Sequence, residues 1–320
     1  MSDFQGPLAQ QLTAFVAFKR SLGFKYNAEV TMLRRFDRWT QSQPGPQGML
    51  TEALVGAWLQ RGVLEGARTL YGRTSLMRQV GLYLNTVGQP AYIPEPLAGN
   101  RHYTFVPHIF TEHELSRIFA EADRVAAPRP STLPVVLPVL FRLLYGCGLR
   151  VSEALGLTLE DIDWTNQTLT IRDSKFGKDR VIPMASSLTT VLQEYVNSVH
   201  PESPPSAWVF GHRDGSPISA DNVYRRFRDI LWYAGIPHRG KGQGPRVHDL
   251  RHSFAVHTLK AAIDRQVDIH AMLPVLSVYL GHASVAATEQ YVRLTADAFP
   301  ELRQTLDLAA GWVIPEVAWE

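Results

Sequence analysis

The chain has 320 residues, of which 45% are hydrophobic and 19% are charged, so it can bury a sizeable core and favours two domains over one. No apolar run reaches the roughly 18 residues that cross a bilayer, and the polar start MSDFQGPLAQ lacks the pattern of a secretion signal. We therefore expect a soluble cytoplasmic protein without a membrane partner. Because Cys147 is the one cysteine, an intrachain disulfide is excluded, nothing points to a cysteine-based metal site, and a buried apolar role is favoured.

The formal net charge of +2 is too small to indicate a nucleic-acid partner by itself. The charge is unevenly distributed, with 10 basic and 6 acidic residues in the first hundred positions and 22 basic and 24 acidic residues after them. A basic N-terminal module is compatible with a protein that clamps DNA, although a difference this small also arises by chance.

The N-terminal part is expected to form a small bundle of helices. Apolar residues recur at helical spacing over 8–22 and 28–41, which predicts two amphipathic helices. The patterns that begin at Thr51 and Thr69 predict a third and a fourth helix.

A proline-rich stretch, QPAYIPEPLAGNRHYTFVP, follows the fourth predicted helix. Its prolines disfavour a helix and its side chains show no strand alternation, so we expect an extended linker that ends at about residue 107. This divides the chain into a helical domain, residues 1–100, and a second domain, residues 108–320.

Helices are expected to dominate the second domain as well. Thr111 with Glu114 three residues later is typical of a capping box that opens a helix. Residues 133–145 are nearly all apolar and predict a buried helix that ends at Gly146 and Gly148.

A short β section interrupts these helices. Alternation over 168–172, a polar turn over 174–179 and a second short run over 180–183 predict a hairpin, and helical patterning resumes at Ala220. The fold class is therefore mainly α with a small β-hairpin or sheet in the second domain (α+β).

Two basic residues stand close to turns in this domain. Arg150 follows the glycines in YGCGLRVSEALGL, where it could simply pair with Glu153. Lys175 lies at the hairpin turn, where a lysine is usually solvated.

Four further polar residues follow towards the C-terminus. His248 and Arg251 in HDLRHSF are three apart and share a helix face, although a buried, hydrogen-bonded histidine is the commoner reason for such a residue. His282 in YLGHAS could cap a helix, and Tyr291 in EQYVRL could be a core aromatic.

Together, these residues and the motifs around them indicate more than each does alone. The chain contains five motifs in this order: GLRVSEALGL, DSKFGKDRVIPM, HDLRHSFAVHTL, YLGHAS and ATEQYVRL. With them it resembles the tyrosine recombinase (phage integrase) family over roughly residues 108–300. The N-terminal helices resemble the family's core-binding domain in kind more than in sequence. The residues that the resemblance assigns to catalysis are Arg150, Lys175, His248, Arg251, His282 and Tyr291.

The resemblance implies a phosphoryl transfer that needs neither a metal nor another cofactor. Arg150 and Arg251 would present planar forks of donors to the nonbridging phosphate oxygens. Lys175 would give a proton to the leaving 5′ oxygen, with Lys178 as the rival candidate.

The same resemblance assigns the groups around the nucleophile. Tyr291 would attack the phosphodiester and leave a 3′-phosphotyrosine and a free 5′ hydroxyl, whereas Tyr279 is expected to pack in the core. His248 is implied as a base or orienting group near the tyrosine hydroxyl, and His282 as a hydrogen-bond donor to the phosphate.

The implied partners are double-stranded DNA with specific recombination sites and further protomers, as a tetramer on DNA or with related recombinases. Neighbouring basic residues on one predicted helix are candidate phosphate contacts, although a solvated face is at least as good an explanation for each: Arg34, Arg35 and Arg38. The apolar tail after Pro300 is expected to dock on the next protomer, or equally on its own domain.

The segment around IDRQVDIHAMLP makes the interval from Arg251 to His282 longer than in typical Xer-type members, and resembles recombinases encoded by transposons. Integration, excision or transposition of a mobile element is therefore expected, although the segment could also form a different protomer interface. The alternatives are a DNA-binding accessory protein of the same fold that does not cut, a type IB topoisomerase, and a helical scaffold.

Overall fold

The computed structural model describes residues 4–43, 48–63, 65–97, 106–126, 131–172, 179–237, 244–282 and 284–299. The chain forms two compact units, Met1–Phe105 and Val106–Glu320. Residues 89–97, at the end of the first unit, contain neither helix nor strand. Among the described residues, no helix is long and apolar enough to span a membrane.

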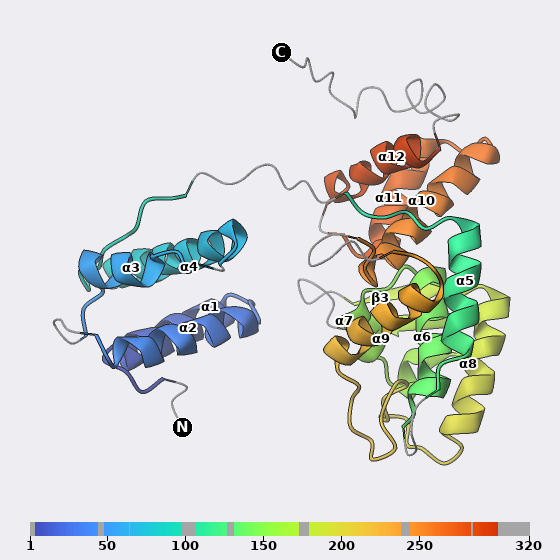
Figure 1. The fold of residues 1–320 in the computed structure, drawn as a ribbon, viewed down its shortest axis with the longest axis horizontal. Coiled ribbons are helices and arrows are strands. Elements are labelled where there is room, and N and C mark those ends of the chain that lie inside the picture. The colour runs from blue at the N-terminus through green and yellow to red at the C-terminus, as the bar shows by residue number, and fades with distance from the viewer. Residues whose placement is uncertain are drawn as a thin grey trace. The chain divides into compact units, whose positions relative to one another are not determined.

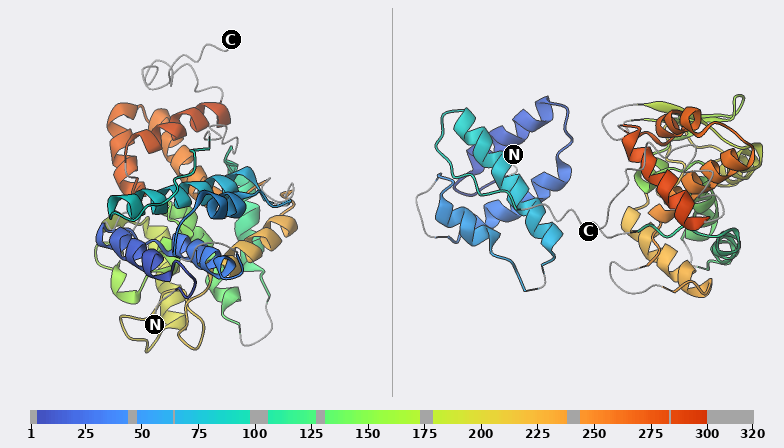
Figure 2. Two further views of the ribbon diagram at one scale, coloured as in Figure 1. Left: turned by 90° about the vertical axis from the view of Figure 1, so that its left-hand side faces the viewer. Right: turned by 90° about the horizontal axis from the view of Figure 1, so that it is seen from above.

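The first unit contains the four expected helices: α1 (Ala9–Ser21), α2 (Asn27–Thr40), α3 (Glu52–Leu59) and α4 (Ala67–Thr86). Helices α1 and α2 form one layer and α3 and α4 the other (Figure 1), and the layers cross when the unit is seen from above (Figure 2). Phe15, Leu33, Phe36 and Met77 are completely buried between them, which explains the spacing of the apolar residues.

The second unit begins with the helices that form its main core, α5 (Glu112–Asp123) and α6 (Leu133–Gly146). The expected capping box is confirmed, because the Thr111 side chain accepts from the Glu114 amide and the Glu114 carboxylate accepts from the Thr111 amide. Helix α6 is buried along most of its length and packs against α5, α8 and α10, so it is the centre of this unit. Cys147, at its end, is buried as expected.

The expected hairpin is present as part of a three-stranded antiparallel sheet. Strands β2 (Thr168–Ile171) and β3 (Arg180–Pro183) pair with Leu169 opposite Ile182, and β1 (Ile162–Asp163), which the sequence did not predict, pairs on the other side of β2. Residues 173–178, which include most of the expected turn, lie outside the described residues, and so do Lys175 and Lys178. The mainly helical fold with a small sheet is confirmed.

The remaining helices are α7 (Val151–Leu155), which follows α6, and α8 (Ser186–Val199), α9 (Ala220–Tyr233), α10 (His248–Asp264), α11 (Ile269–Leu280) and α12 (Ala286–Ala298). The last three pack together at one end of the unit (Figure 1), around a second apolar cluster that includes Leu259, Leu280 and Val292. The longer segment noted in the sequence forms the end of α10 and the start of α11. The tail after Pro300 lies outside the described residues.

Candidate active site

The site begins at the turn between α6 and α7. Gly148 has a φ of +56°, and a Cβ there would lie 2.5 Å from the Phe254 ring, so both the backbone and the space require glycine. Arg150 follows, and its backbone amide and Nη1 donate to the Glu153 carboxylate at 2.9 and 2.6 Å. The pairing that the sequence left open is therefore real. It does not occupy the whole guanidinium, because Nη2 donates to the Gly281 carbonyl at 3.1 Å.

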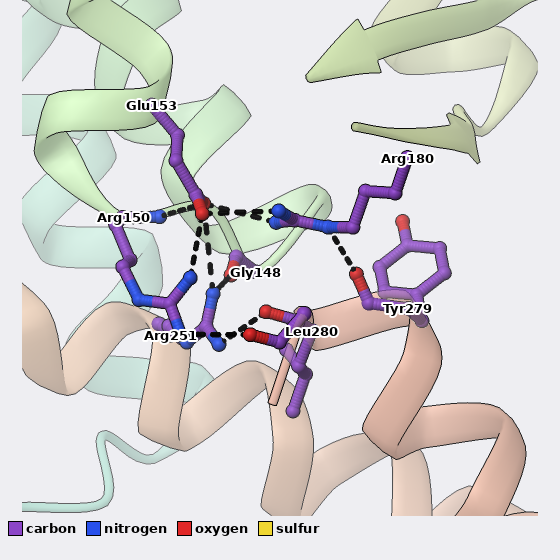
Figure 3. A network of polar contacts seen from close by, with 8 residues as sticks. Gly148, Arg150, Glu153, Arg180, Arg251, Tyr279 and Leu280 are labelled. Carbon is purple, nitrogen blue, oxygen red and sulfur yellow. Dashed lines mark hydrogen bonds and ion pairs between the residues drawn. The ribbon is translucent and has the colours of Figure 1, made fainter. Parts of the chain in front are cut away.

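Glu153 is the centre of an ionic network (Figure 3). Arg180, at the start of β3, donates from Nη1 and Nη2 to its two oxygens at 3.0 and 2.9 Å, and Arg251 Nη1 lies 3.7 Å from Oε2. Burial alone would raise the pKa of Glu153, but the hydrogen bonds and charges of Arg180 and Arg150 outweigh it and lower that pKa to about 2. The carboxylate is therefore ionised at neutral pH.

The guanidinium groups also cover the C-terminal end of α11. Arg251 donates from Nη2 to the Leu280 carbonyl at 2.6 Å and from Nη1 to the Gly148 carbonyl at 2.8 Å, and Arg180 Nε donates to the Tyr279 carbonyl at 2.9 Å (Figure 3). The last carbonyls of a helix lack partners within it and carry partial negative charge, so cations stabilise them. The end of α11 thus fixes the position of these arginines.

Arg251 is 1% exposed. Burial, together with the charge of Arg150, lowers its pKa to about 10, which still leaves it charged at neutral pH. Gly281 ends α11 with a φ of +66°, and a Cβ there would lie 2.8 Å from Arg180 Nη1. Glycine at this position allows the arginines to approach the helix end closely.

Tyr291 lies on α12 and is 1% exposed, in the second apolar cluster. Its Oη lies 3.1 Å from His252 Nδ1, and its ring stacks on that of His282 with 6.0 Å between centroids. Burial raises the pKa of Tyr291, while the charge of Arg251 opposes this shift. The residue is both a core aromatic, as one interpretation of the sequence held, and a neighbour of the buried arginine.

The three histidines differ in their surroundings. His248 is exposed, so a buried structural histidine is the wrong explanation for it; crowding by protein atoms and the charges of Arg251 and Arg150 lower its pKa. His282 Nδ1 lies 2.8 Å from the hydroxyl of Thr288, and burial followed by the charge of Arg251 lowers its pKa to about 4. Both rings are therefore neutral at pH 7.

The structure brings five of the six residues predicted for catalysis into one region: Arg150, His248, Arg251, His282 and Tyr291. The sixth, Lys175, lies outside the described residues. Tyr279 instead stacks on Phe254 and donates its hydroxyl to the Pro183 carbonyl, so it packs as expected.

Sequence reasoning missed two members of the site, Arg180 and His252. Both lie within family motifs, Arg180 in KDRVIPM and His252 in HDLRHSF. His252 follows His248 by four residues, so the two share a helix face. That spacing was the available signal for His252. The partner of Arg180 lies 27 positions away, and no local pattern marks such a pair.

The arginines expected to contact DNA lie in the first unit, on successive turns of α2, and all three are exposed: Arg34, Arg35 and Arg38. Arg38 Nε donates to the Arg34 carbonyl at 3.4 Å. Within the described part of the chain, no cluster of three or more His, Cys, Asp or Glu side chains could hold a metal ion.

Comparison with known proteins identifies the family. Residues 108–297 match the phage integrase family profile. The Sinorhizobium fredii protein y4rB, provisionally named an integrase/recombinase, is 29% identical over 96% of this chain and 98% of its own length. The tyrosine recombinase XerA of Pyrococcus furiosus is 33% identical over 59% of this chain and 68% of its own length.

Among solved structures, the Tn1549 transposon integrase in complex with transposon right end DNA has the same fold. Its TM-score is 0.61 at 17% identity, over 91% of this chain and 97% of that one. The family profile covers more than half of the chain and includes every residue of the site described above. The protein therefore belongs to the phage integrase family, the tyrosine recombinases.

Proposed function

We propose that this protein is a site-specific DNA recombinase that cuts and rejoins DNA strands through a 3′-phosphotyrosine at Tyr291. The observation that carries the proposal is the convergence of Arg150 and Arg251 beside the end of α11, with Tyr291 and His282 packed next to them. Paired permanent cations next to a hydroxyl nucleophile are what phosphoryl transfer requires when no metal supplies the charge.

The two arginines have complementary parts in this reaction. Arg251 is held rigidly by two carbonyls and so provides a fixed positive charge, while Arg150 is partly exposed and can turn donors towards a bound phosphate. Donors fixed in advance stabilise the charge that develops on the nonbridging oxygens without reorganisation during the reaction.

The remaining groups complete the proposed chemistry. His282 engages Thr288 through Nδ1, which leaves Nε2 as the nitrogen that would donate to the phosphate. Lys175 is assigned as the acid for the leaving 5′ oxygen on the strength of its motif. Attack by a 5′ hydroxyl on the phosphotyrosine then rejoins the strands, so the bond energy is conserved within the adduct.

The proposed partners are double-stranded DNA with recombination sites and further copies of the recombinase, as a tetramer that passes through a Holliday junction. The first unit would act as the core-binding domain, over about residues 1–100, and residues 108–320 as the catalytic domain with its docking tail. A role in moving a mobile element draws support from the long segment before α11 and from the likeness to y4rB and the transposon integrase.

The test is a search for the covalent intermediate. The protein is incubated with nicked duplexes from the DNA flanking its own gene, and adducts that survive denaturant are compared for the wild type, Tyr291→Phe and the matched control Tyr279→Phe. We expect an adduct from the wild type and the control, and none from Tyr291→Phe.

Three other results would contradict the proposal. An adduct from Tyr291→Phe would mean that another residue is the nucleophile. Binding by the wild type without any adduct would favour a non-cutting accessory protein. Relaxation of a supercoiled plasmid that lacks any specific site would favour a type IB topoisomerase.

A further inference from the structure

His252 contacts the atom that the proposed reaction uses as nucleophile. It follows Arg251 on α10, and its Nδ1 lies 3.1 Å from Tyr291 Oη. The two rings are 5.7 Å apart between centroids, and Tyr291 is almost fully buried. The hydroxyl of Tyr291 therefore interacts with a protein nitrogen rather than with bulk water.

We propose that His252 is a further catalytic residue, whose Nδ1 accepts a hydrogen bond from the Tyr291 hydroxyl and takes its proton during attack on the phosphodiester. This rests on the function proposed above. The O–H bond of Tyr291 breaks as its oxygen bonds to phosphorus, and the proton moves to Nδ1. The bond from phosphorus to the 5′ oxygen breaks, and that oxygen takes a proton from the acid assigned to Lys175. Rejoining returns both protons.

The other two histidines are less well placed for this task. The His248 ring is exposed and meets the His252 ring edge-on, with 4.8 Å between centroids, whereas His252 Nδ1 itself lies 3.1 Å from the tyrosine oxygen. The His282 ring stacks on the Tyr291 ring within 14° of parallel, and its Nδ1 already lies 2.8 Å from the Thr288 hydroxyl. The geometry assigns the hydroxyl to His252.

The electrostatic setting keeps His252 unprotonated before the substrate binds. Burial, then the charges of His248 and Arg251, lower its pKa to about 3, so the ring is neutral at pH 7. With its proton on Nε2, Nδ1 is a free acceptor. A phosphodiester bound at the arginines brings a negative charge that favours the imidazolium, so the basicity of His252 rises when the substrate is in place.

The chain offers a matched control on the same helix. His257 Nδ1 lies 2.9 Å from the hydroxyl of Tyr145, and His257 is partly buried like His252. It lines a different cavity, with Lys260 and Phe299, that includes none of the site arginines. Substitution of either histidine could destabilise α10, whereas only substitution of His252 should impair the nucleophile Tyr291.

The experiment uses the full chain with nicked duplexes that carry either an ordinary 5′ oxygen or a bridging 5′ sulfur at the scissile phosphate. The variants are His252→Ala, His252→Asn, His257→Asn and Lys175→Ala. Loss of a general base typically costs about 10²- to 10⁴-fold, so we expect His252→Ala to form adduct at least about 100-fold more slowly while binding DNA as tightly as the wild type.

The sulfur substrate identifies which side of the reaction fails. Sulfur leaves without a proton, so it should restore Lys175→Ala but not His252→Ala. His252→Asn retains a hydrogen-bond acceptor but no base, so it should remain impaired. This variant tests the proposal even if His252→Ala fails to fold. His257→Asn should cleave normally.

Two kinds of failure are distinguishable. Normal cleavage by the His252 variants, rescue of them by sulfur, or an equal loss in His257→Asn would overturn the role of His252 and leave the proposed function standing. A wild type that forms no adduct on either substrate would overturn the proposed function, and the role of His252 with it.

Discussion

The molecule uses arginine in two contrasting settings. The α2 arginines are exposed on one helix of the first unit: Arg34, Arg35 and Arg38. The site arginines converge on one carboxylate and the end of α11 in the second unit: Arg150, Arg180 and Arg251. The same side chain is solvated in one place and held by several fixed acceptors in the other.

This contrast shows what burial demands of a charged group. Removing a guanidinium from water is costly unless every donor is matched, so the site arginines require Glu153 and the carbonyls of residues 279–281. The α2 arginines are exposed, so water can solvate their guanidinium groups. We therefore expect substitutions in the buried group to change stability and chemistry, and substitutions in the exposed group to change the long-range attraction of DNA.

The largest effect is expected from Glu153→Gln, which removes the negative charge that Arg150 and Arg180 share. Breaking a buried ion pair on one side typically costs about 3–5 kcal/mol, and we expect the free energy of unfolding at pH 7 to fall by that amount. Denaturant titration measures it. The control is Asp123→Asn, because Asp123 forms a two-bond pair with Arg142 at the surface, where such pairs contribute at most about 1 kcal/mol.

The stability difference between wild type and Glu153→Gln should also depend on pH, in a direction that the pKa of Glu153 fixes. The pKa of Glu153 is about 2 in the folded protein, below its ordinary value of 4.5, so its stabilisation is complete above pH 4.5 and is lost as the pH falls towards 2. The difference in unfolding free energy between wild type and Glu153→Gln should therefore shrink below pH 4.5. A constant difference down to pH 3 would mean that the effect is steric.

A somewhat smaller effect is expected from Arg251→Lys. Lysine keeps the charge but not the planar fork that reaches the Gly148 and Leu280 carbonyls. Loss of one fixed donor to a transition-state oxygen typically costs about 10²- to 10³-fold in rate, and single-turnover adduct formation should slow accordingly. Arg35→Lys is the exposed counterpart, and its cleavage rate should not change. Retention of rate in Arg251→Lys would show that charge alone suffices.

The smallest effect is expected from replacing Arg34, Arg35 and Arg38 together with glutamine. If they contact phosphates, the slope of log affinity against log salt concentration should lose up to about 0.9 for each contact, while cleavage at saturating DNA stays unchanged. Mobility-shift titrations at several salt concentrations measure this slope. An unaltered slope would leave the α2 arginines as a solvated face.

Much of the fold could be predicted from sequence because its helices have regular apolar faces. Helix α8 was not predicted, although Leu188, Leu192 and Tyr195 show helical spacing, because serine, threonine and valine are frequent in SSLTTVLQEYVNSV and favour helices weakly. Strand β1 was missed because its two residues are too short to show alternation.

The site could be predicted residue by residue but not contact by contact. The family motifs identify Arg150 and Tyr291. No spacing rule shows that Arg180 contacts Glu153, or that His252 and not His248 contacts the tyrosine hydroxyl. These contacts join segments 27 and 39 positions apart, and only tertiary packing creates them. From the sequence, an ion pair with Glu153 and binding to phosphate were alternative roles for Arg150, but one guanidinium can combine them.

The sharing of Glu153 has a consequence for handling the protein in solution. Three guanidinium groups against one carboxylate leave two positive charges in excess among these four side chains. Small oxyanions that bind there would stabilise the folded state by mass action and compete with the DNA backbone. We therefore expect a phosphate or sulfate buffer to raise the melting temperature and to slow DNA cleavage, so a buffer that stabilises the protein in storage is a poor choice for its assay.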